Sequence, residues 1–444
     1  MEKLKFSSIH FIGIGGIGMS ALARWALSKK MDVSGYDAIE SDLTKSLEAE
    51  GATIHYEKES INFINNSEKL VVYTPAISKN HPQIVDALEK KLKIIKRAEL
   101  LGYITKQGIC LAVAGTHGKT TTSCLLAWII YNSGIPVQGF FGGISKNFET
   151  NYIEGEPGIT IVEADEFDRS FLHLEPSASV ITSTDPDHLD YYKTQNQLER
   201  AFKDFAKKSK KCFVHKDVKT ISGESYGLGD QKFGADNVLS NQGSQFFDLI
   251  LDGEKYKNVH AGMAGEHNIE NAIAASVLAK EIGVSVKNII KGIESFKGVK
   301  RRFEILVSNR DNIYIDDYAH HPTEIKKLIN SIKKIFPGKP IAMLFQPHLF
   351  SRTQDFIENF KEILSEIDML GILPIYAARE NPIPGINSEK LVHLIPKSNM
   401  VSFENGTKWL CNQRGHIKVT AGAGDIDRLV PDIVHYLKKL KNEG

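Results

Sequence analysis

The strongest candidate for chemistry is the glycine turn at residues 115–120, which reads GTHGKT. An uninterrupted apolar run, 109–114, precedes it and predicts a buried strand, and a helical pattern follows to about residue 132. Backbone N–H groups in such a turn, with the helix N-terminus, surround phosphate oxygens. Lys119 would neutralise the β- and γ-phosphates, and the Thr120 hydroxyl would bind Mg²⁺. Val113 stands where the common phosphate-loop pattern has its first glycine, so a plain helix start is the alternative interpretation.

Acidic residues and a histidine follow two further predicted strands. They are Glu163, Asp165, Glu166 and Asp168 after the strand that begins at 159, and Asp187, His188 and Asp190 after the strand at 178–183. The carboxyl ends of parallel strands form the ligand-binding edge of an open α/β sheet. Carboxylates and imidazoles suit Mg²⁺ or Mn²⁺ when substrate phosphates complete the coordination. Together with Thr120 they predict a metal site, and helix capping by the acids is the alternative.

A second glycine turn lies near the N-terminus. Gly13, Gly15 and Gly18 fit the G-x-G-x-x-G pattern after a predicted strand, Gly16 lies within it, and Asp37 ends the next strand. The pattern indicates that a nucleotide diphosphate binds at the turn and the following helix. NAD and a UDP-type diphosphate fit equally well, and a tight strand-to-helix turn without a ligand is the remaining alternative.

Polar side chains also cluster at predicted strand ends in the last third of the chain. They include Arg301, Arg302, Asp316, Asp317, Tyr318, His320, His321, Glu324, Gln346, His348, Ser351 and Arg352. Arg302 could neutralise phosphate charge, whereas His320, His348 and Arg352 could hold a carboxylate. Taken singly, each is as consistent with helix capping or solvation.

The elements that must position these residues form three α/β segments, 1–106, 107–298 and 299–444. In the first, strands alternate with helical stretches, which predicts a parallel sheet with helices on both faces. The second has a central parallel sheet, a peripheral sheet between residues 207 and 260, and a helix from Gly265 to Ala279. The third is again an open α/β pattern.

Composition excludes several classes of protein. With 444 residues the chain is long enough for about three domains, and 55 basic against 54 acidic residues give a net charge of +1. This balance argues against a nucleic-acid partner. No apolar run reaches the roughly 18 residues of a membrane span, and the glycine-rich start does not resemble a signal peptide. Four scattered cysteines, Cys110, Cys124, Cys212 and Cys411, predict reduced thiols in a cytoplasmic protein.

Taken together, the motifs resemble those of the Mur ligase family, in matching order over nearly the whole chain. Residues 115–120, 163–166, 187–190 and 265–272 resemble the family's ATP site. Residues 10–19, 316–324, 345–348 and 375–385 resemble its alanine-adding branch. The resemblance implies a Rossmann-like N-terminal domain for the UDP-sugar, a central P-loop ATPase-type parallel sheet with a peripheral antiparallel sheet for ATP, and a Rossmann-like C-terminal domain for the amino acid.

The resemblance also implies a role for each matching residue. For the UDP-sugar these are Gly13, Gly15, Gly16, Gly18, Asp37 and Thr74; for ATP they are Gly115, Thr116, His117, Gly118, Lys119, Thr120, Thr121, Asn268, Asn271, Arg302 and Asp317. Thr120 would hold one Mg²⁺, and Glu163 and His188 a second, with Mn²⁺ able to substitute. The residues implied in catalysis are Lys119, Glu163, His188, Arg302, His320, His348 and Arg352. Asp165, Glu166 and Asp168 would either bind metal or position substrate.

The activity implied is ATP-dependent joining of L-alanine to UDP-N-acetylmuramate through an acyl phosphate, in peptidoglycan precursor synthesis. The chain departs from the family's usual pattern at Leu349, where an arginine is common, and this leaves a tripeptide-recycling ligase as the alternative within the family. An NAD-dependent oxidoreductase and a regulatory protein that kept the ATP loop are rivals from other classes. The protein is expected to have no nucleic-acid or membrane partner and to be a monomer or homodimer.

Overall fold

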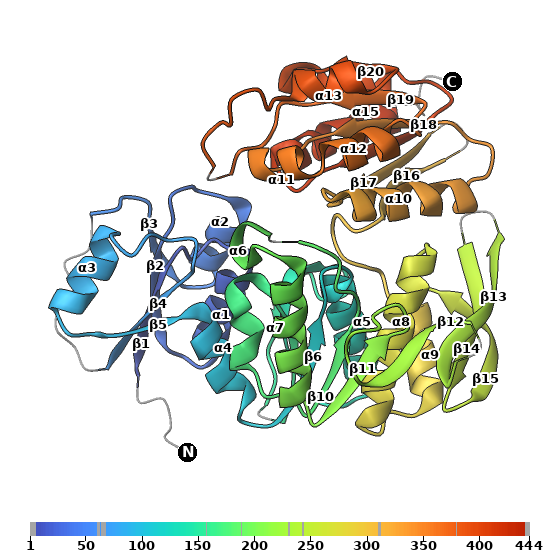
Figure 1. Cartoon of the computed structure of the whole chain (residues 1–444). Coiled ribbons are helices and arrows are strands. Elements are labelled where there is room, and N and C mark those ends of the chain that lie inside the picture. Colours follow the sequence, from blue (N-terminus) through green and yellow to red (C-terminus); the bar gives the residue numbers. More distant parts are fainter. Residues whose placement is uncertain are drawn as a thin grey trace. The chain divides into compact units, whose positions relative to one another are not determined.

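The computed structural model describes residues 6–59, 63, 68–156, 158–187, 189–229, 231–241, 244–309, 312–378 and 380–439. The described chain folds into three sheets with flanking helices, coloured from blue to red in Figure 1. It divides into two compact units. The first comprises Met1–Asp236, Asp248–Val259 and Glu270–Lys297, and the second comprises Asn237–Phe247, His260–Ile269 and Gly298–Gly444.

The N-terminal sheet is parallel throughout, with strand order β3-β2-β1-β4-β5. Its strands are β1 (Ser8–Ile12), β2 (Asp32–Tyr36), β3 (Thr53–His55), β4 (Lys69–Tyr73) and β5 (Lys93–Lys96), and its helices are α1 (Ile17–Ser28), α2 (Asp42–Ala49), α3 (Pro82–Glu89) and α4 (Arg97–Thr105). All five residues of β1 are buried, as expected for a central strand covered on both faces.

The register of this sheet brings four chain segments to one level. Ile12 of β1 lies opposite both Tyr36 and Tyr73, and Tyr73 lies opposite Lys96. The next residue in each segment therefore starts from the same carboxyl edge of the sheet. These four residues are Gly13, Asp37, Thr74 and Arg97.

The middle sheet has ten strands in the order β15-β14-β13-β12-β11-β10-β6-β9-β7-β8. They are β6 (Ile109–Ala114), β7 (Gln138–Ser145), β8 (Thr150–Ile153), β9 (Ile159–Ala164), β10 (Ala178–Ile181), β11 (Lys211–His215), β12 (Glu224–Leu228), β13 (Phe233–Asn241), β14 (Ser244–Leu251) and β15 (Glu254–Ala261). The sheet is mixed, because β7 and β8 are antiparallel while the pairs around β6 are parallel. The strands predicted as a peripheral sheet extend this same sheet.

The helices of the middle segment are α5 (Lys119–Asn132), α6 (Leu189–Tyr192), α7 (Gln195–Lys208), α8 (Glu266–Glu281) and α9 (Val286–Glu294), with a 3₁₀ segment, η1 (Phe167–His173). Ala114, the last residue of β6, lies opposite both Ala164 and Ile181. Three segments therefore leave the sheet at one edge, beginning with Gly115, Asp165 and Thr182.

Within the first unit, α1 packs against the hairpin of β7 and β8. A buried polar network joins them: Arg24 of α1 donates to Asn151 of β8 and also pairs with Glu50 at 2.8 Å. The Asn151 amide donates in turn to the Ile17 carbonyl at 2.6 Å and to Ser20 Oγ at 2.9 Å. One hydrophobic core also spans both sheets. The N-terminal sheet and the β7–β8 hairpin of the middle sheet are therefore held together through α1.

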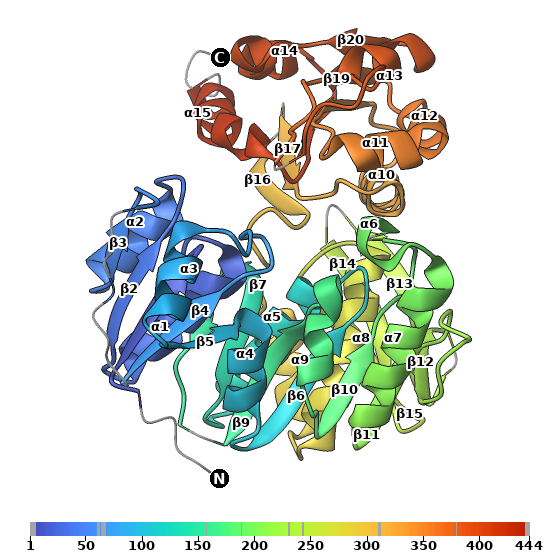
Figure 2. The same cartoon turned by 60° about the vertical axis from the view of Figure 1, so that its left-hand side comes forward.

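The C-terminal sheet has the order β16-β17-β21-β18-β19-β20. Its strands are β16 (Glu304–Ser308), β17 (Ile313–Asp317), β18 (Ile341–Phe345), β19 (Met369–Ile372), β20 (Ser398–Met400) and β21 (Ile417–Ala421). Its helices are α10 (Pro322–Ile335), α11 (Phe350–Asp355), α12 (Ile357–Leu364), α13 (Ser388–Leu394), α14 (Gly406–Cys411) and α15 (Val430–Lys439), with 3₁₀ segments η2 (Phe403–Asn405) and η3 (Asp425–Leu429). Among the described strands of this sheet, only β16 runs antiparallel to its neighbour. The turned view in Figure 2 shows α14 and α15 on one side of this sheet and α10 to α12 on the other.

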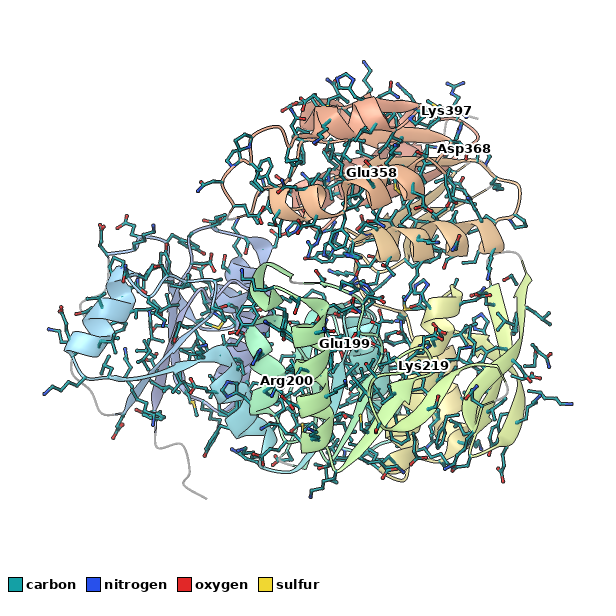
Figure 3. The ribbon with its side chains drawn as sticks, in the orientation of Figure 1. Glu199, Arg200, Lys219, Glu358, Asp368 and Lys397 are labelled. Atoms are coloured by element: carbon teal, nitrogen blue, oxygen red, sulfur yellow. The ribbon has the colours of Figure 1, made fainter. Side chains whose placement is uncertain are left out.

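Charged side chains of both signs lie on the surface, in keeping with the balanced composition. Arg200 and Lys219 are exposed in the middle segment, as are Glu358, Asp368 and Lys397 in the C-terminal segment (Figure 3). The four cysteines are free thiols. Among the helices of the described residues, none has the length and apolar character needed to cross a membrane.

Candidate active site

The phosphate-loop candidate has the backbone that its glycines require. Gly115 and Gly118 have φ of +130° and +81°, values that favour glycine. A side chain on Gly115 would collide with Thr182, and a Cβ on Gly118 would lie 2.5 Å from the Asn271 Oδ1 atom. The loop therefore has room only for glycine at both positions, and its backbone approaches two neighbouring segments closely.

The segment that follows β10 holds this loop in place. Ser183 Oγ accepts from the His117 amide at 3.0 Å and lies 2.8 Å from the Thr116 hydroxyl. Asp185 contributes a carboxylate 3.3 Å from the His117 ring. The sequence analysis gave no role to Thr182 or Ser183, although they are the last two residues of the strand predicted at 178–183; in the structure β10 ends at Ile181, and both follow it at the same edge.

Lys119 is held in an ion pair with a buried acid. Its ammonium donates to the Gly115 carbonyl at 2.6 Å and lies 3.0 and 2.8 Å from the two carboxylate oxygens of Glu166, whose side chain is 0% exposed. Burial disfavours the charged amine, but the attraction of Glu166, Asp165 and Glu163 outweighs it, so the pKa of Lys119 is raised above its ordinary value. The lysine is a permanent cation beside the loop.

The remaining acids after β9 have different partners. Glu163 accepts the Gly142 amide at 2.8 Å, and a Cβ on Gly142 would lie 2.5 Å from its carboxylate. Asp165 pairs with Arg97 at 3.0 Å. Asp168 lies 3.8 Å from the Lys96 ammonium and accepts from the Ser170 hydroxyl. Thus Glu163 faces β7, whereas Asp165 and Asp168 face cations of the N-terminal segment.

The predicted metal ligands are placed in part. Thr120 is buried in the first turn of α5, and Glu163 is the fifth residue of β9, near enough to act on the Lys119 charge. Their hydroxyl and carboxylate oxygens are the donors that Mg²⁺ prefers, so the residues present fit this ion. His188 lies outside the described residues, within which no group of three or more metal-binding side chains gathers.

Asn268 and Asn271, both predicted for ATP and expected from the family resemblance to contact adenine, lie one turn apart on α8. Asn271 Oδ1 accepts from the Thr122 hydroxyl at 3.1 Å and lies against Gly118. Asn268 donates to the Ala264 carbonyl at 2.7 Å. Asn271 belongs to the first compact unit and Asn268 to the second. The structure therefore brings Asn271 to the loop.

The N-terminal glycine turn is tied to the neighbouring strands. Gly13 has φ +89°, and its amide donates to the Tyr36 carbonyl at 2.7 Å. A Cβ on Gly13 would lie 2.9 Å from the Thr74 methyl group. Asp37 accepts the Gly15 amide at 2.8 Å. Four of the residues predicted for the UDP-sugar are thus brought together, and Asp37 shapes the turn itself.

A buried histidine, His10, lies on β1, the strand that leads into this turn. The ring nitrogens of His10 lie 2.9 Å from Ser34 Oγ and 3.1 Å from Gln83 Oε1. Burial disfavours the imidazolium and lowers the pKa of His10 from 6.5 to about 4. His10 is therefore a neutral, hydrogen-bonded group at physiological pH.

In the second unit, the residues predicted to surround the amino acid gather at one sheet edge. The His320 and His348 rings lie 5.6 Å apart, and His348 stacks on Tyr376 at 5.8 Å. Arg352 Nη1 lies 3.2 Å from His348 Nδ1. Tyr376 lies in the segment 375–385 that resembles the family, but it was given no role there; its ring reaches the cluster from the chain after β19. Two imidazoles and a guanidinium are suited to hold a small carboxylate.

Arg302 and Asp317 lie at the same edge. Asp317 accepts the amides of Phe303 at 2.6 Å and Ala319 at 2.7 Å. Its burial raises the pKa to about 6, although the nearby Arg302 opposes that shift. Arg302 lies 4.9 Å from the Tyr318 ring centre. The second unit thus collects the five predicted side chains Arg302, Asp317, His320, His348 and Arg352.

Leu349, the residue that departs from the expected arginine, has an unusual backbone. Its φ is +70° with ψ 137°, at the N-cap of α11, and its amide donates to the Tyr376 carbonyl at 2.9 Å. A branched residue in this region is strained, and such strain is found often at functional sites. Leu349 lies between His348 and Arg352 in the sequence, and these two side chains contact each other at 3.2 Å.

Comparisons with known proteins identify the same family along nearly the whole chain. Three family models match: "Mur ligase family, catalytic domain" at residues 8–108, "Mur ligase middle domain" at 113–279 and "Mur ligase, glutamate ligase domain" at 301–423. The UDP-N-acetylmuramate–L-alanine ligase of Christiangramia forsetii is 43% identical over 435 residues, covering 96% of each chain.

Solved structures show the same fold. The UDP-N-acetylmuramate–alanine ligase of Thermotoga maritima superimposes with a TM-score of 0.85 at 26% identity, covering 97% of this chain and 99% of that one. A murein peptide ligase from Psychrobacter arcticus superimposes with a TM-score of 0.70 at 22% identity, covering 97% and 98%.

Proposed function

Because the chain belongs to the Mur ligase family, we propose that it joins L-alanine to the lactyl carboxylate of UDP-N-acetylmuramate, with cleavage of ATP to ADP and phosphate. The observation that carries this proposal is the presence, in one compact unit, of the phosphate loop with Lys119 and of the N-terminal glycine turn with Asp37. An ATP site and a sugar-nucleotide site in one compact unit are what the first half of this reaction needs.

The reaction begins with activation of a poor electrophile. The γ-phosphoryl group of ATP passes to an oxygen of the lactyl carboxylate, which releases ADP and leaves an acyl phosphate. The alanine amine then attacks the acyl carbon, an amide bond forms, a proton leaves the nitrogen, and phosphate departs. The chain must bring three anionic groups together, and at a separation of about 4 Å each like-charge pair costs about 4 kcal/mol at intermediate dielectric.

The residues of the chain supply charge where those anions meet. Lys119 is a permanent cation at the loop, and Arg302 would add a second from the C-terminal segment. Mg²⁺, which the Thr120 hydroxyl and the Glu163 carboxylate are suited to hold, would neutralise phosphate charge. His320, His348 and Arg352 would orient the alanine carboxylate so that the amine faces the acyl carbon.

Several finer predictions accompany this proposal. They are the second Mg²⁺ at Glu163 and His188, substitution by Mn²⁺, adenine contacts from Asn268 and Asn271, a monomeric or homodimeric state, and a cytoplasmic location. ATP use is supported by the family and by the loop geometry. The within-family alternative, transfer of a whole tripeptide, is supported only by Leu349, whereas the full-length relatives are named for alanine.

Phosphate release by the purified protein tests the proposal. The protein receives ATP, Mg²⁺ and UDP-N-acetylmuramate with L-alanine, L-serine, glycine or the tripeptide in parallel. We expect the fastest release with L-alanine. A preference for the tripeptide would establish the alternative, and release that no amino compound stimulates would refute both. A change in absorbance at 340 nm with NAD(H) would instead indicate an oxidoreductase.

The variant Lys119→Ala tests the role of the loop. The substitution removes the cation that the triphosphate needs, so we expect phosphate release to be abolished. Binding of UDP-N-acetylmuramate, measured by isothermal titration calorimetry, should persist because the glycine turn is untouched. Normal turnover by Lys119→Ala would remove the loop from the proposed chemistry.

A further inference from the structure

Arg97 lies at the same sheet edge as the N-terminal glycine turn, although no sequence motif marked it. It directly follows β5, and the register from Lys96 through Tyr73 to Ile12 places it level with Gly13. It is also the first residue of α4, and its side chain is only 18% exposed. The guanidinium therefore starts from the edge where the sugar nucleotide is expected.

The guanidinium lies against the first turn of α1. A side chain on Gly18 would collide with Nη1 of Arg97, so the two are in close approach. The first turn of a helix carries partial positive charge, and a cation placed there is disfavoured in the absence of an anion. A diphosphate bound at the glycine turn would be attracted by the helix terminus and by Arg97 together. In the structure the Asp165 carboxylate supplies one anion, and the five N–H donors of a guanidinium allow it to bind a diphosphate as well.

The opposite side of the guanidinium faces the ATP-binding edge. Nη2 of Arg97 donates to Asp165 Oδ2 at 3.0 Å, and Asp165 directly follows β9, level with the start of the phosphate loop. Lys96 and Asp168 form a parallel, longer pair at 3.8 Å. Both pairs lie within the first compact unit. One planar side chain thus touches the edges that carry both proposed nucleotide sites.

We propose that Arg97 binds the diphosphate of the sugar nucleotide and that Asp165 holds the guanidinium in the orientation that this contact requires. The inference rests on the proposed function, because its ligand is the UDP-sugar named there. A guanidinium can donate to two anions at once from its fixed fork, which an ammonium does less well. Asp165 is accordingly a positioning residue for the sugar nucleotide and not a ligand of Mg²⁺.

Titration calorimetry of the full chain with UDP-N-acetylmuramate tests the role of Arg97. We expect Arg97→Gln to raise the Kd by about ten- to a hundredfold, as for loss of a charge-assisted hydrogen bond, and Arg97→Lys to restore part of the affinity. The advantage of UDP over UMP should shrink in Arg97→Gln, because only UDP has the full diphosphate. The Kd of an ATP analogue should stay unchanged.

Lys106→Gln is the matched control. Lys106 caps the other end of α4 and pairs with Glu175 at 2.9 Å on the surface, so its loss removes one charge from the same helix without touching the turn. We expect wild-type binding from this variant. An Arg97→Gln protein that binds UDP-N-acetylmuramate as tightly as wild type would overturn the assignment.

Asp165→Asn tests the positioning role. We expect a raised Kd for UDP-N-acetylmuramate, no further loss when it is combined with Arg97→Gln, and an unchanged Mg²⁺ concentration for half-maximal phosphate release. A raised Mg²⁺ requirement with unchanged sugar-nucleotide binding would show that Asp165 serves the metal instead. If wild type itself neither binds UDP-N-acetylmuramate nor responds to alanine, the proposed function fails as well. An active wild type with an unaffected Arg97→Gln refutes only the present inference.

Discussion

Substitution of Glu166 by Gln is expected to destabilise the free protein and to make its stability depend more strongly on bound nucleotide. Glu166 is completely buried, and the Lys119 ammonium lies 2.8 and 3.0 Å from its two oxygens. The variant leaves Lys119 with neutral acceptors, among them the Gly115 carbonyl at 2.6 Å. A buried cation would then lack its principal counter-charge.

The size of the effect follows from this geometry. Two unit charges 2.8 Å apart attract by about 6 kcal/mol at an effective dielectric constant of 20. The cost of burying both ions offsets much of this attraction, and removal of one partner of a buried pair typically costs about 3–5 kcal/mol. Since Gln keeps one acceptor oxygen, we expect about 3 kcal/mol, equivalent to a Tm lower by about 6–12 °C.

Differential scanning calorimetry with and without a non-hydrolysable ATP analogue and Mg²⁺ measures the effect. The triphosphate supplies negative charge to Lys119, so the analogue should raise the Tm of Glu166→Gln by more than that of wild type. The double variant Lys119→Met/Glu166→Gln should recover part of the lost stability, because it leaves no unpaired charge. Glu175→Gln, which breaks an exposed pair, should leave the free energy of unfolding nearly unchanged.

Two results would refute this reasoning. One is a Glu166→Gln protein that melts at the wild-type temperature with and without nucleotide. The other is strict additivity of the two single substitutions, which would mean that Lys119 and Glu166 do not act as a pair.

Three further predictions concern other parts of the chain. The pKa of His10 is lowered to about 4, so below pH 6.5 the unfolded chain binds a proton that the folded chain does not bind. The free energy of unfolding should therefore fall by up to about 3 kcal/mol from pH 6.5 to 4. Urea denaturation of His10→Gln should show a smaller fall over this range, and an equal fall in both proteins would argue against a neutral His10. Gly142→Ala places a Cβ 2.5 Å from the Glu163 carboxylate and should raise the Mg²⁺ concentration for half-maximal phosphate release; an unchanged requirement would separate Glu163 from the metal. Arg352→Lys should raise the KM for alanine by about tenfold while the KM for ATP stays constant, and equal effects on both would indicate a structural role.

Local patterns were sufficient to predict the strand, the glycine turn and the helix around Gly115. The strand, turn and helix around Gly115 are adjacent in sequence, so their order alone indicates the geometry. Val113, which breaks the common phosphate-loop pattern, is a buried residue within β6, and the shorter loop begins only after the strand ends. The helix expected from Gly265 is present as α8.

Contacts between distant segments could not be predicted from a single sequence. Lys119 and Glu166 are 47 residues apart, and Arg97 and Asp165 are 68 apart, so their pairing depends on strand order and register. The hairpin of β7 and β8 was missed because Gly139, Gly142 and Gly143 interrupt the apolar pattern that identifies strands. The continuity of the middle sheet into β12 and β13 likewise depends on edge pairing, which composition does not report.

The alignment of residues along the carboxyl edge of the N-terminal sheet also determines where the chain can vary in length. Each of Gly13, Asp37, Thr74 and Arg97 lies one residue beyond an aligned strand position. Insertion of a single residue within β5 would rotate Arg97 to the opposite face of the sheet, since side chains alternate along a strand. The tight turn at Asp252 and Gly253, between β14 and β15, is less crowded, because a Cβ on Gly253 would meet no neighbour within 4 Å. Homologues should therefore differ in length at such hairpin tips and keep the strand lengths that precede Gly13, Asp37, Thr74 and Arg97.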